Sequence, residues 1–144
     1  MKIEKSIQLK APQSRVWRAL TKPEEFGKWF GVQVTQEFVP GERVKMLFVF
    51  QGKEIEGYLT VDRLEPESYF SWRWHPGKPD PKVDYSKEPT TLVEFHLEEA
   101  EGGTLLKVIE SGFEKISLAR RAGVYGDNDG GWAAQLKNIE KYVG

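Results

Sequence analysis

Two polar residues could bring chemistry into the interior of this protein, Glu110 and Gln135. Leu106, Val108 and Glu110 fall at alternate positions of one predicted strand, so they share a face of it. If that face points inward, the carboxyl group of Glu110 is buried and could serve as a general acid or base. The alternative is a β-bulge that reverses the parity and leaves Glu110 exposed. Glu110 is therefore the titratable residue whose placement matters most.

Metal binding is not expected. His75 and His96 are the only histidines, and neither stands at a spacing typical of ligands. The run Asp127-Asn128-Asp129-Gly130 is similar to the start of a calcium loop, but the twelfth position of that loop is Asn138 rather than an acidic residue. We interpret this run as the N-cap of the last helix, where acidic side chains accept free backbone N–H groups.

Nucleophilic and phosphate-binding motifs are not found either. The chain has no cysteine, and Ser111 has no neighbouring base in the sequence. The glycine pairs Gly102-Gly103 and Gly130-Gly131 fit a turn and a helix start better than a phosphate loop. We therefore predict no catalytic residue, no metal and no cofactor, and favour a binding protein over an enzyme.

Aromatic residues are numerous, with five Trp, five Tyr and eight Phe. They could simply fill a core. Many of them, however, fall at the predicted ends of elements, where binding sites are commonly made. Those at element ends are Trp29 and Phe30, Phe48 and Phe50, Trp72 and Trp74, and Trp132.

Composition indicates one globular domain over residues 1–144. Hydrophobic residues make up 39% and charged residues 30% of the chain, and the net charge is -1. Because the charges are interspersed, nucleic-acid binding is not expected. The N-terminus has no apolar signal-peptide core, and no apolar run reaches the roughly 18 residues of a membrane span. We expect a cytoplasmic protein.

The elements that would position these residues follow from periodicity. A first strand over residues 3–9 precedes two short helices, which begin near Pro12 and Pro23. Alternating strands then occupy much of the stretch between Val34 and Phe113, interrupted by a polar loop from Pro76 to Pro89 that could be a lid. Trp132 is predicted to open the last helix, whose apolar face is Trp132, Leu136, Ile139 and Val143, with Gln135 between Trp132 and Ile139.

Several of these segments resemble a known family. The segments Ala11-Pro12, Val16-Trp17, Leu20-Thr21 and Lys28-Trp29-Phe30-Gly31 resemble the opening of the START-related, polyketide-cyclase-like (SRPBCC) superfamily. The segments Gly103-Thr104-Leu105-Leu106 and Glu110-Ser111-Gly112-Phe113, followed by Gly131-Trp132 and Leu136, resemble its branch called activator of heat-shock protein 90 ATPase-like.

The resemblance implies an α+β helix-grip fold, in which a curved antiparallel sheet wraps a long C-terminal helix and two short helices follow the first strand. It also implies a cavity between sheet and helix for a small hydrophobic molecule such as a lipid, quinone, polyketide or aromatic compound. The predicted ligand-binding residues are Trp29, Phe48, Phe50, Trp72, Trp74, Glu110, Trp132, Gln135 and Ile139. The alternatives are a cyclase or hydrolase that uses Glu110 as acid or base, and a module that interacts with a chaperone.

Overall fold

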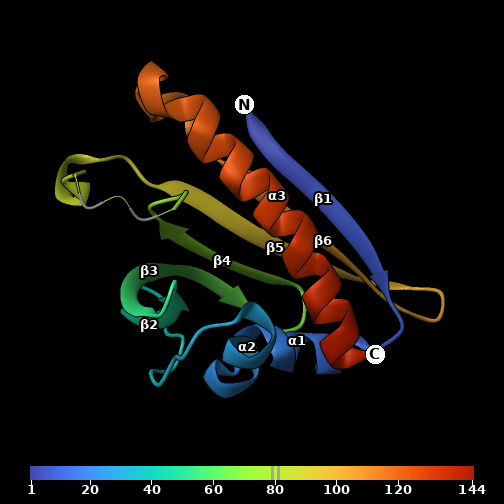
Figure 1. Ribbon diagram of the computed structural model, residues 1–144. Coiled ribbons are helices and arrows are strands. Elements are labelled where there is room, and N and C mark those ends of the chain that lie inside the picture. The colour runs from blue at the N-terminus through green and yellow to red at the C-terminus, as the bar shows by residue number, and fades with distance from the viewer. Residues whose placement is uncertain (79, 81) are drawn as a thin grey trace.

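A single curved antiparallel sheet and one long helix form the body of the protein (Figure 1). The computed structural model describes residues 1–78, 80 and 82–144, except for the side chain of Phe50. Six strands lie in the order β1 (Lys2–Leu9), β6 (Gly103–Ser111), β5 (Thr91–Ala100), β4 (Tyr69–Trp74), β3 (Lys53–Glu65) and β2 (Arg43–Phe50). The predicted α+β helix-grip fold is confirmed.

Strand parity decides which side chains face the helix. In β6 every second residue from Thr104 to Glu110 is buried, and in β5 the same holds from Thr91 to Leu97. The register of β6 with β1 and β5 runs without a shift, whereas β3 changes register against β4 between Val61 and Arg63. Glu110 therefore points inward, as its parity with Leu106 and Val108 predicts.

Two short helices, α1 (Gln13–Thr21) and α2 (Pro23–Phe30), follow β1 as predicted. Pro23 occupies the first turn of α2, where its missing N–H removes no hydrogen bond. Gly31 ends α2 in the left-handed region with φ of 86°, a conformation that favours glycine. Gly27 is needed for a different reason, because a Cβ atom there would lie 2.5 Å from the carbonyl oxygen of Val32.

The last helix, α3 (Leu118–Val143), is longer than predicted. The sequence interpretation of residues 127–130 as its N-cap is wrong, and Trp132 lies inside the helix rather than at its start. The N-cap is Ser117, which makes no side-chain capping hydrogen bond. A glycine inside a helix lowers the stability of that helix by about 1 kcal/mol relative to alanine. Four glycines fall within residues 123–131, so the sequence of this segment does not indicate a helix.

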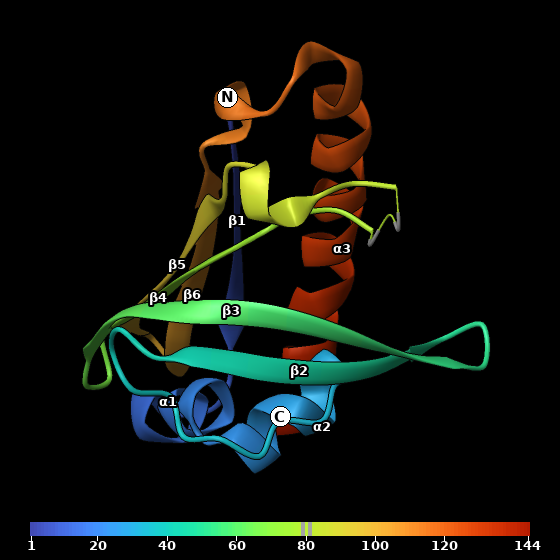
Figure 2. The ribbon, with the colours of Figure 1, turned by 90° about the vertical axis from the view of Figure 1, so that its left-hand side faces the viewer.

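Helix α3 crosses the concave face of the sheet, and α1 and α2 lie beside its C-terminal end (Figure 2). Arg15 of α1 pairs with Glu25 of α2 at 2.5 Å, and the hydroxyl of Tyr142 of α3 donates to the same carboxylate at 3.2 Å. The loop between β4 and β5 contains a short 3-10 helix, η1 (Tyr85–Lys87), and a second one, η2 (Phe113–Lys115), follows β6. Among the described residues, no helix has the length and apolarity that crossing a bilayer requires.

Candidate functional site

Glu110 lies at the centre of a buried hydrogen-bond network between the sheet and α3. Its side chain is fully buried, with 0% of the residue exposed. Four side chains donate to its two carboxylate oxygens. The donors are Trp74 Nε1 at 2.8 Å, Thr91 Oγ1 at 2.5 Å, Trp132 Nε1 at 2.8 Å, and Asn128 Nδ2 at 2.8 and 3.0 Å from the two oxygens.

The chemistry of these partners suits a carboxylate. Indole N–H and amide NH₂ groups can only donate, and a carboxylate can only accept. Within the described residues, no Lys, Arg or His forms an ion pair with Glu110. The network therefore satisfies the oxygens with neutral dipoles alone, and five contacts occupy the roughly four acceptor positions of a carboxylate. This arrangement supports a positioning role for Glu110 rather than proton transfer.

A pocket of about 180 Å³ lies over this network. It is lined by Phe30, Trp74, Asn128, Gly131, Trp132 and Gln135, which come from α2, β4 and α3. The amide of Gln135 donates to the carbonyl oxygen of Phe30 at 2.9 Å and so ties α3 to the end of α2 at the pocket wall. Three aromatic rings and two amides thus surround a small space, and Glu110 lies behind the side chains of Trp74, Asn128 and Trp132.

Beneath the pocket the interior of the grip is filled by aromatic rings. Trp72 is fully buried, and its ring lies 5.3 Å from that of Trp74 and 6.3 Å from that of Trp132. Phe95 packs edge-on against Trp132 at 5.6 Å. The Nε1 atom of Trp72 is buried and has no hydrogen-bond partner among the residues that the structure describes, which costs about 1–3 kcal/mol for such a group. These rings fill the space beneath the pocket, and the pocket itself lies against Asn128, Gly131, Trp132 and Gln135 in the middle of α3.

The loop after β4 reaches toward α3 in Figure 2, and two hydrogen bonds attach it to that helix. The backbone N–H of Gly77 donates to Asn128 Oδ1 at 2.9 Å, and the N–H of Lys78 donates to Asp127 Oδ2 at 3.4 Å. Farther along, Glu88 pairs with Arg120. Asn128 therefore uses one end of its amide for the loop and the other for Glu110.

The structure brings four of the predicted ligand-binding residues together, namely Trp74, Glu110, Trp132 and Gln135. Trp72 adjoins them from below. Trp29 and Ile139 are also buried, but neither lines the pocket; the indole of Trp29 donates to the carbonyl oxygen of Ala19 at 2.7 Å. The side chain of Phe50 lies outside the described residues.

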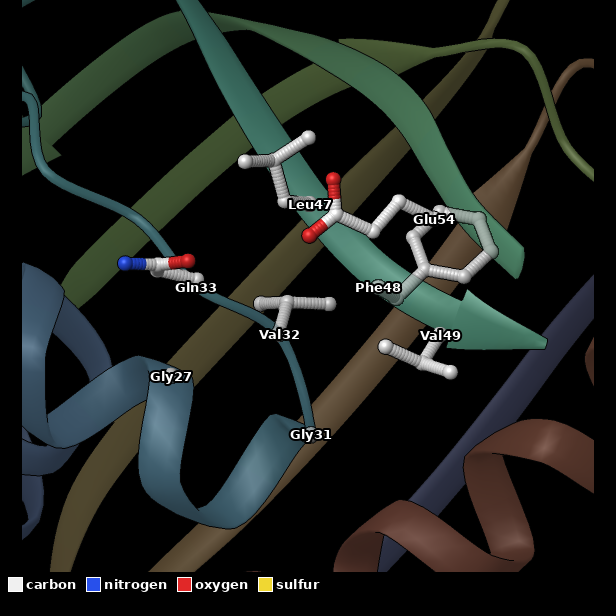
Figure 3. A pocket seen from close by; sticks show the side chains of 8 residues that line it. All are labelled: Gly27, Gly31, Val32, Gln33, Leu47, Phe48, Val49 and Glu54. Carbon is white, nitrogen blue, oxygen red and sulfur yellow. The ribbon is translucent and has the colours of Figure 1, made fainter. Parts of the chain in front are cut away.

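Phe48 lies in a different hollow, a surface groove between the end of α2 and β2 (Figure 3). This groove has a volume of about 360 Å³ and is lined by Gly27, Gly31, Val32, Gln33, Leu47, Phe48, Val49 and Glu54. Backbone hydrogen bonds between Gln33 and Leu47, of 2.7 and 3.0 Å, join its two sides. It is larger than the pocket over Glu110, but no set of polar side chains converges in it.

Four residues that line the pocket or donate to Glu110 were not predicted from the sequence, namely Phe30, Thr91, Asn128 and Gly131. Asn128 precedes Trp132 by four residues and Val124 precedes Asn128 by four, so a helix that extends through this segment places all three on one face. Thr91 shares the inward parity of Val93 and Phe95. Both patterns are present in the sequence, but the glycines of α3 obscure the helical spacing of Val124, Asn128 and Trp132.

Solved structures share this fold over nearly the whole chain. Protein MLL2253 from Mesorhizobium loti is similar with a TM-score of 0.78 and 23% identity, covering 99% of this chain and 96% of that one. The Aha1 dimer from Colwellia psychrerythraea has a TM-score of 0.72 and 20% identity, with 99% and 96% covered. DynU16, from the dynemicin biosynthetic locus, has a TM-score of 0.73 and 22% identity, with 99% of this chain but 46% of that chain covered.

A search among curated proteins finds no match. The family model described as activator of Hsp90 ATPase homolog 1-like protein, in contrast, matches residues 10–144, which include both short helices, the sheet from β2 to β6, and α3. The predicted resemblance is thereby confirmed, and the chain belongs to the activator of Hsp90 ATPase homolog 1-like family.

Proposed function

We propose that this protein binds a small hydrophobic ligand in the pocket formed by Phe30, Trp74, Asn128, Gly131, Trp132 and Gln135. Membership of the family supports a ligand-binding domain in general. The observation that carries the proposal is the convergence of Trp74, Asn128 and Trp132 on the buried carboxylate of Glu110. Such a network holds the pocket walls in one conformation before a ligand arrives, which reduces the entropy lost on binding.

The size of the pocket limits the ligand. Sites for drug-sized ligands usually measure about 300–1,000 Å³, and this pocket measures about 180 Å³. It therefore suits a single ring or a short branched group, either as a whole ligand or as one end of a lipid, quinone or polyketide. Apolar and aromatic groups would pack against the indoles of Trp74 and Trp132, and Gln135 would contact a polar substituent.

A pair of glycines in α3 permits a direct test. Gly131 lines the pocket and Gly130 does not, and a Cβ atom at either position would meet no atom within 4 Å. Gly131→Leu should fill the pocket without disturbing α3, whereas Gly130→Leu places the same side chain on the exposed surface. A panel of lipids, quinones, polyketides and simple aromatics is screened by thermal shift and native mass spectrometry against all three proteins.

We expect at least one ligand class to stabilise the wild-type protein and the Gly130→Leu variant in proportion to ligand concentration. The Gly131→Leu variant should lose that stabilisation. Equal stabilisation of both variants would place binding elsewhere, with the groove at Phe48 as the next location to test. If no class stabilised any of the proteins, the proposal would be wrong.

The family match favours a second candidate function, interaction with an Hsp90-type chaperone. It is tested by adding the protein to the chaperone and measuring the rate of ATP hydrolysis. An increase that depends on protein concentration would support this function, and an unchanged rate would exclude it.

A further inference from the structure

We infer that the pocket over Glu110 selects a small organic cation, with a quaternary or alkylated ammonium group as the part it recognises. The inference rests on the proposed function, because it concerns the same pocket, and it adds the sign of the ligand's charge. It is carried by two features on the two sides of the pocket wall, three aromatic rings and a buried anion.

The aromatic rings are those of Phe30, Trp74 and Trp132, which we call the aromatic trio. Their centroids are 6.1 Å apart for Phe30 and Trp74, 6.1 Å for Phe30 and Trp132, and 6.0 Å for Trp74 and Trp132. All three line the pocket. The faces of aromatic rings carry partial negative charge, and cages of such rings bind ammonium groups, most strongly when the site excludes water.

The anion is Glu110, which lies behind this wall. The indole N–H groups of Trp74 and Trp132 both donate to it at 2.8 Å. A donor that points at an anion becomes more polarised, so the ring of each of these two pocket-lining indoles gains electron density. Glu110 thus strengthens the attraction of these two rings for a cation without touching the ligand.

The charge of Glu110 is also felt directly. It has no ion-pair partner within the described part of the chain, and the pocket lining contains no Lys or Arg. On the adjoining loop and helix, Lys78 and Asp127 are of opposite sign and their charged groups lie 4.0 Å apart, so they largely offset each other. A site with one uncompensated negative charge favours cations and disfavours anions.

The test compares three ligands of the same shape and different charge: choline, its neutral carbon isostere 3,3-dimethylbutan-1-ol, and the anion 3,3-dimethylbutanoate. Each is titrated into the ¹⁵N-labelled wild-type protein, and the indole N–H resonances are followed by NMR. The shifts should be confined to Trp74, Trp132 and their neighbour Trp72. Trp29, which does not line the pocket and whose indole N–H donates to the carbonyl oxygen of Ala19, serves as an internal control.

We expect choline to bind roughly tenfold more tightly than the neutral alcohol, a difference equivalent to about 1.4 kcal/mol, and the anion to give no saturable shift. Equal or tighter binding of the alcohol or the anion would overturn the preference for cations while leaving the proposed pocket in place. If none of the three ligands shifted Trp74 or Trp132, the cation inference would also fail, and the proposed function would be decided by its own ligand panel and the Gly131→Leu variant.

A variant at Gln135 tests the electrostatic cause without touching the Glu110 network. Gln135→Lys places a positive charge at the pocket wall, and Gln135→Met removes the same hydrogen bond to Phe30 without adding charge. Choline binding should weaken roughly tenfold or more in the lysine variant relative to the methionine variant, and binding of the alcohol should change equally in both. Equal effects on choline would contradict the inference.

Discussion

Asn128 and Glu110 join the middle of α3 to the end of β6 through one amide and one carboxylate. Asn128 Nδ2 donates to both oxygens of Glu110, at 2.8 and 3.0 Å, while its Oδ1 atom accepts from the N–H of Gly77. An amide can serve both partners because it carries a donor and an acceptor. The sheet, the long helix and the loop after β4 therefore meet at one residue.

Replacing Asn128 by aspartate should destabilise the protein strongly. The Asn128→Asp variant places a second carboxylate against Glu110 and removes the donor, so we expect a loss of about 3–5 kcal/mol, as for a buried charge left without compensation. Urea denaturation measures the change in the free energy of unfolding. Asn138→Asp is the matched control, since Asn138 lies on the exposed side of the same helix and should change stability by less than about 0.5 kcal/mol. Similar losses of unfolding free energy in both variants would show that the hydrogen bonds between Asn128 and Glu110 do not stabilise the protein.

Replacing Glu110 by glutamine tests the network from its centre. Glutamine keeps the shape of Glu110 but turns one acceptor into a donor, which must face the donor groups of Trp74, Thr91, Asn128 and Trp132. We expect a loss of about 2–5 kcal/mol, together with changes in the indole N–H resonances of Trp74 and Trp132. The exposed Glu114→Gln variant should leave both stability and these resonances unchanged. If the Glu110→Gln variant were as stable as the wild type, the five hydrogen bonds to the carboxylate would not contribute to the stability of the fold.

Replacing a glycine by alanine should stabilise the protein at Gly130 in α3 and destabilise it at Gly27 in α2. A Cβ atom at Gly130 meets no atom within 4 Å, so Gly130→Ala should stabilise the protein by about 0.5–1 kcal/mol through helix propensity. In Gly27→Ala the new Cβ atom would lie 2.5 Å from the carbonyl oxygen of Val32, so that variant should be destabilised. Thermal and urea denaturation of both variants measure the difference, and a stabilising effect at Gly27 would contradict this packing.

Stability should fall at alkaline pH because of Tyr69. Burial, with a contribution from the neighbouring Glu94, raises the pKa of Tyr69 above its ordinary value of 10.0. The folded state therefore holds this proton more tightly than the unfolded state does. The resulting stabilisation is complete below about pH 10 and is lost as the pH rises through the folded-state pKa.

Two variants isolate this effect. Tyr69→Phe should remove this part of the alkaline loss, measured as the free energy of unfolding at increasing pH. Glu94→Gln removes the carboxylate that accepts from the hydroxyl of Tyr69 at 2.7 Å and should lower the pKa of Tyr69, measured by tyrosinate absorbance. An alkaline loss of stability that is identical in wild type and Tyr69→Phe would exclude Tyr69 as its source.

Local patterns in the sequence were sufficient to predict most of the fold. Alternation predicted the strands and the shared face of Leu106, Val108 and Glu110, and Pro23 marked the start of α2, because each of these signals acts over a few neighbouring residues. The start of α3 was not predictable in the same way. Its glycines and its uncapped N-terminus oppose local helix formation, so packing on the sheet must stabilise this part of the helix.

The site itself was decided by tertiary structure. The donors to Glu110 lie 18 to 36 residues away in the sequence and come from β4, β5 and α3, so no local period relates them. The sequence alone determined that Glu110 shares a strand face with Leu106 and Val108, and it left open whether a bulge exposes the carboxyl group. Only the crossing of α3 over β4, β5 and β6 decided that two indoles, a hydroxyl and an amide would surround it, because an unpaired buried carboxylate is too costly to keep and these donors are the ones that the crossing brings within reach.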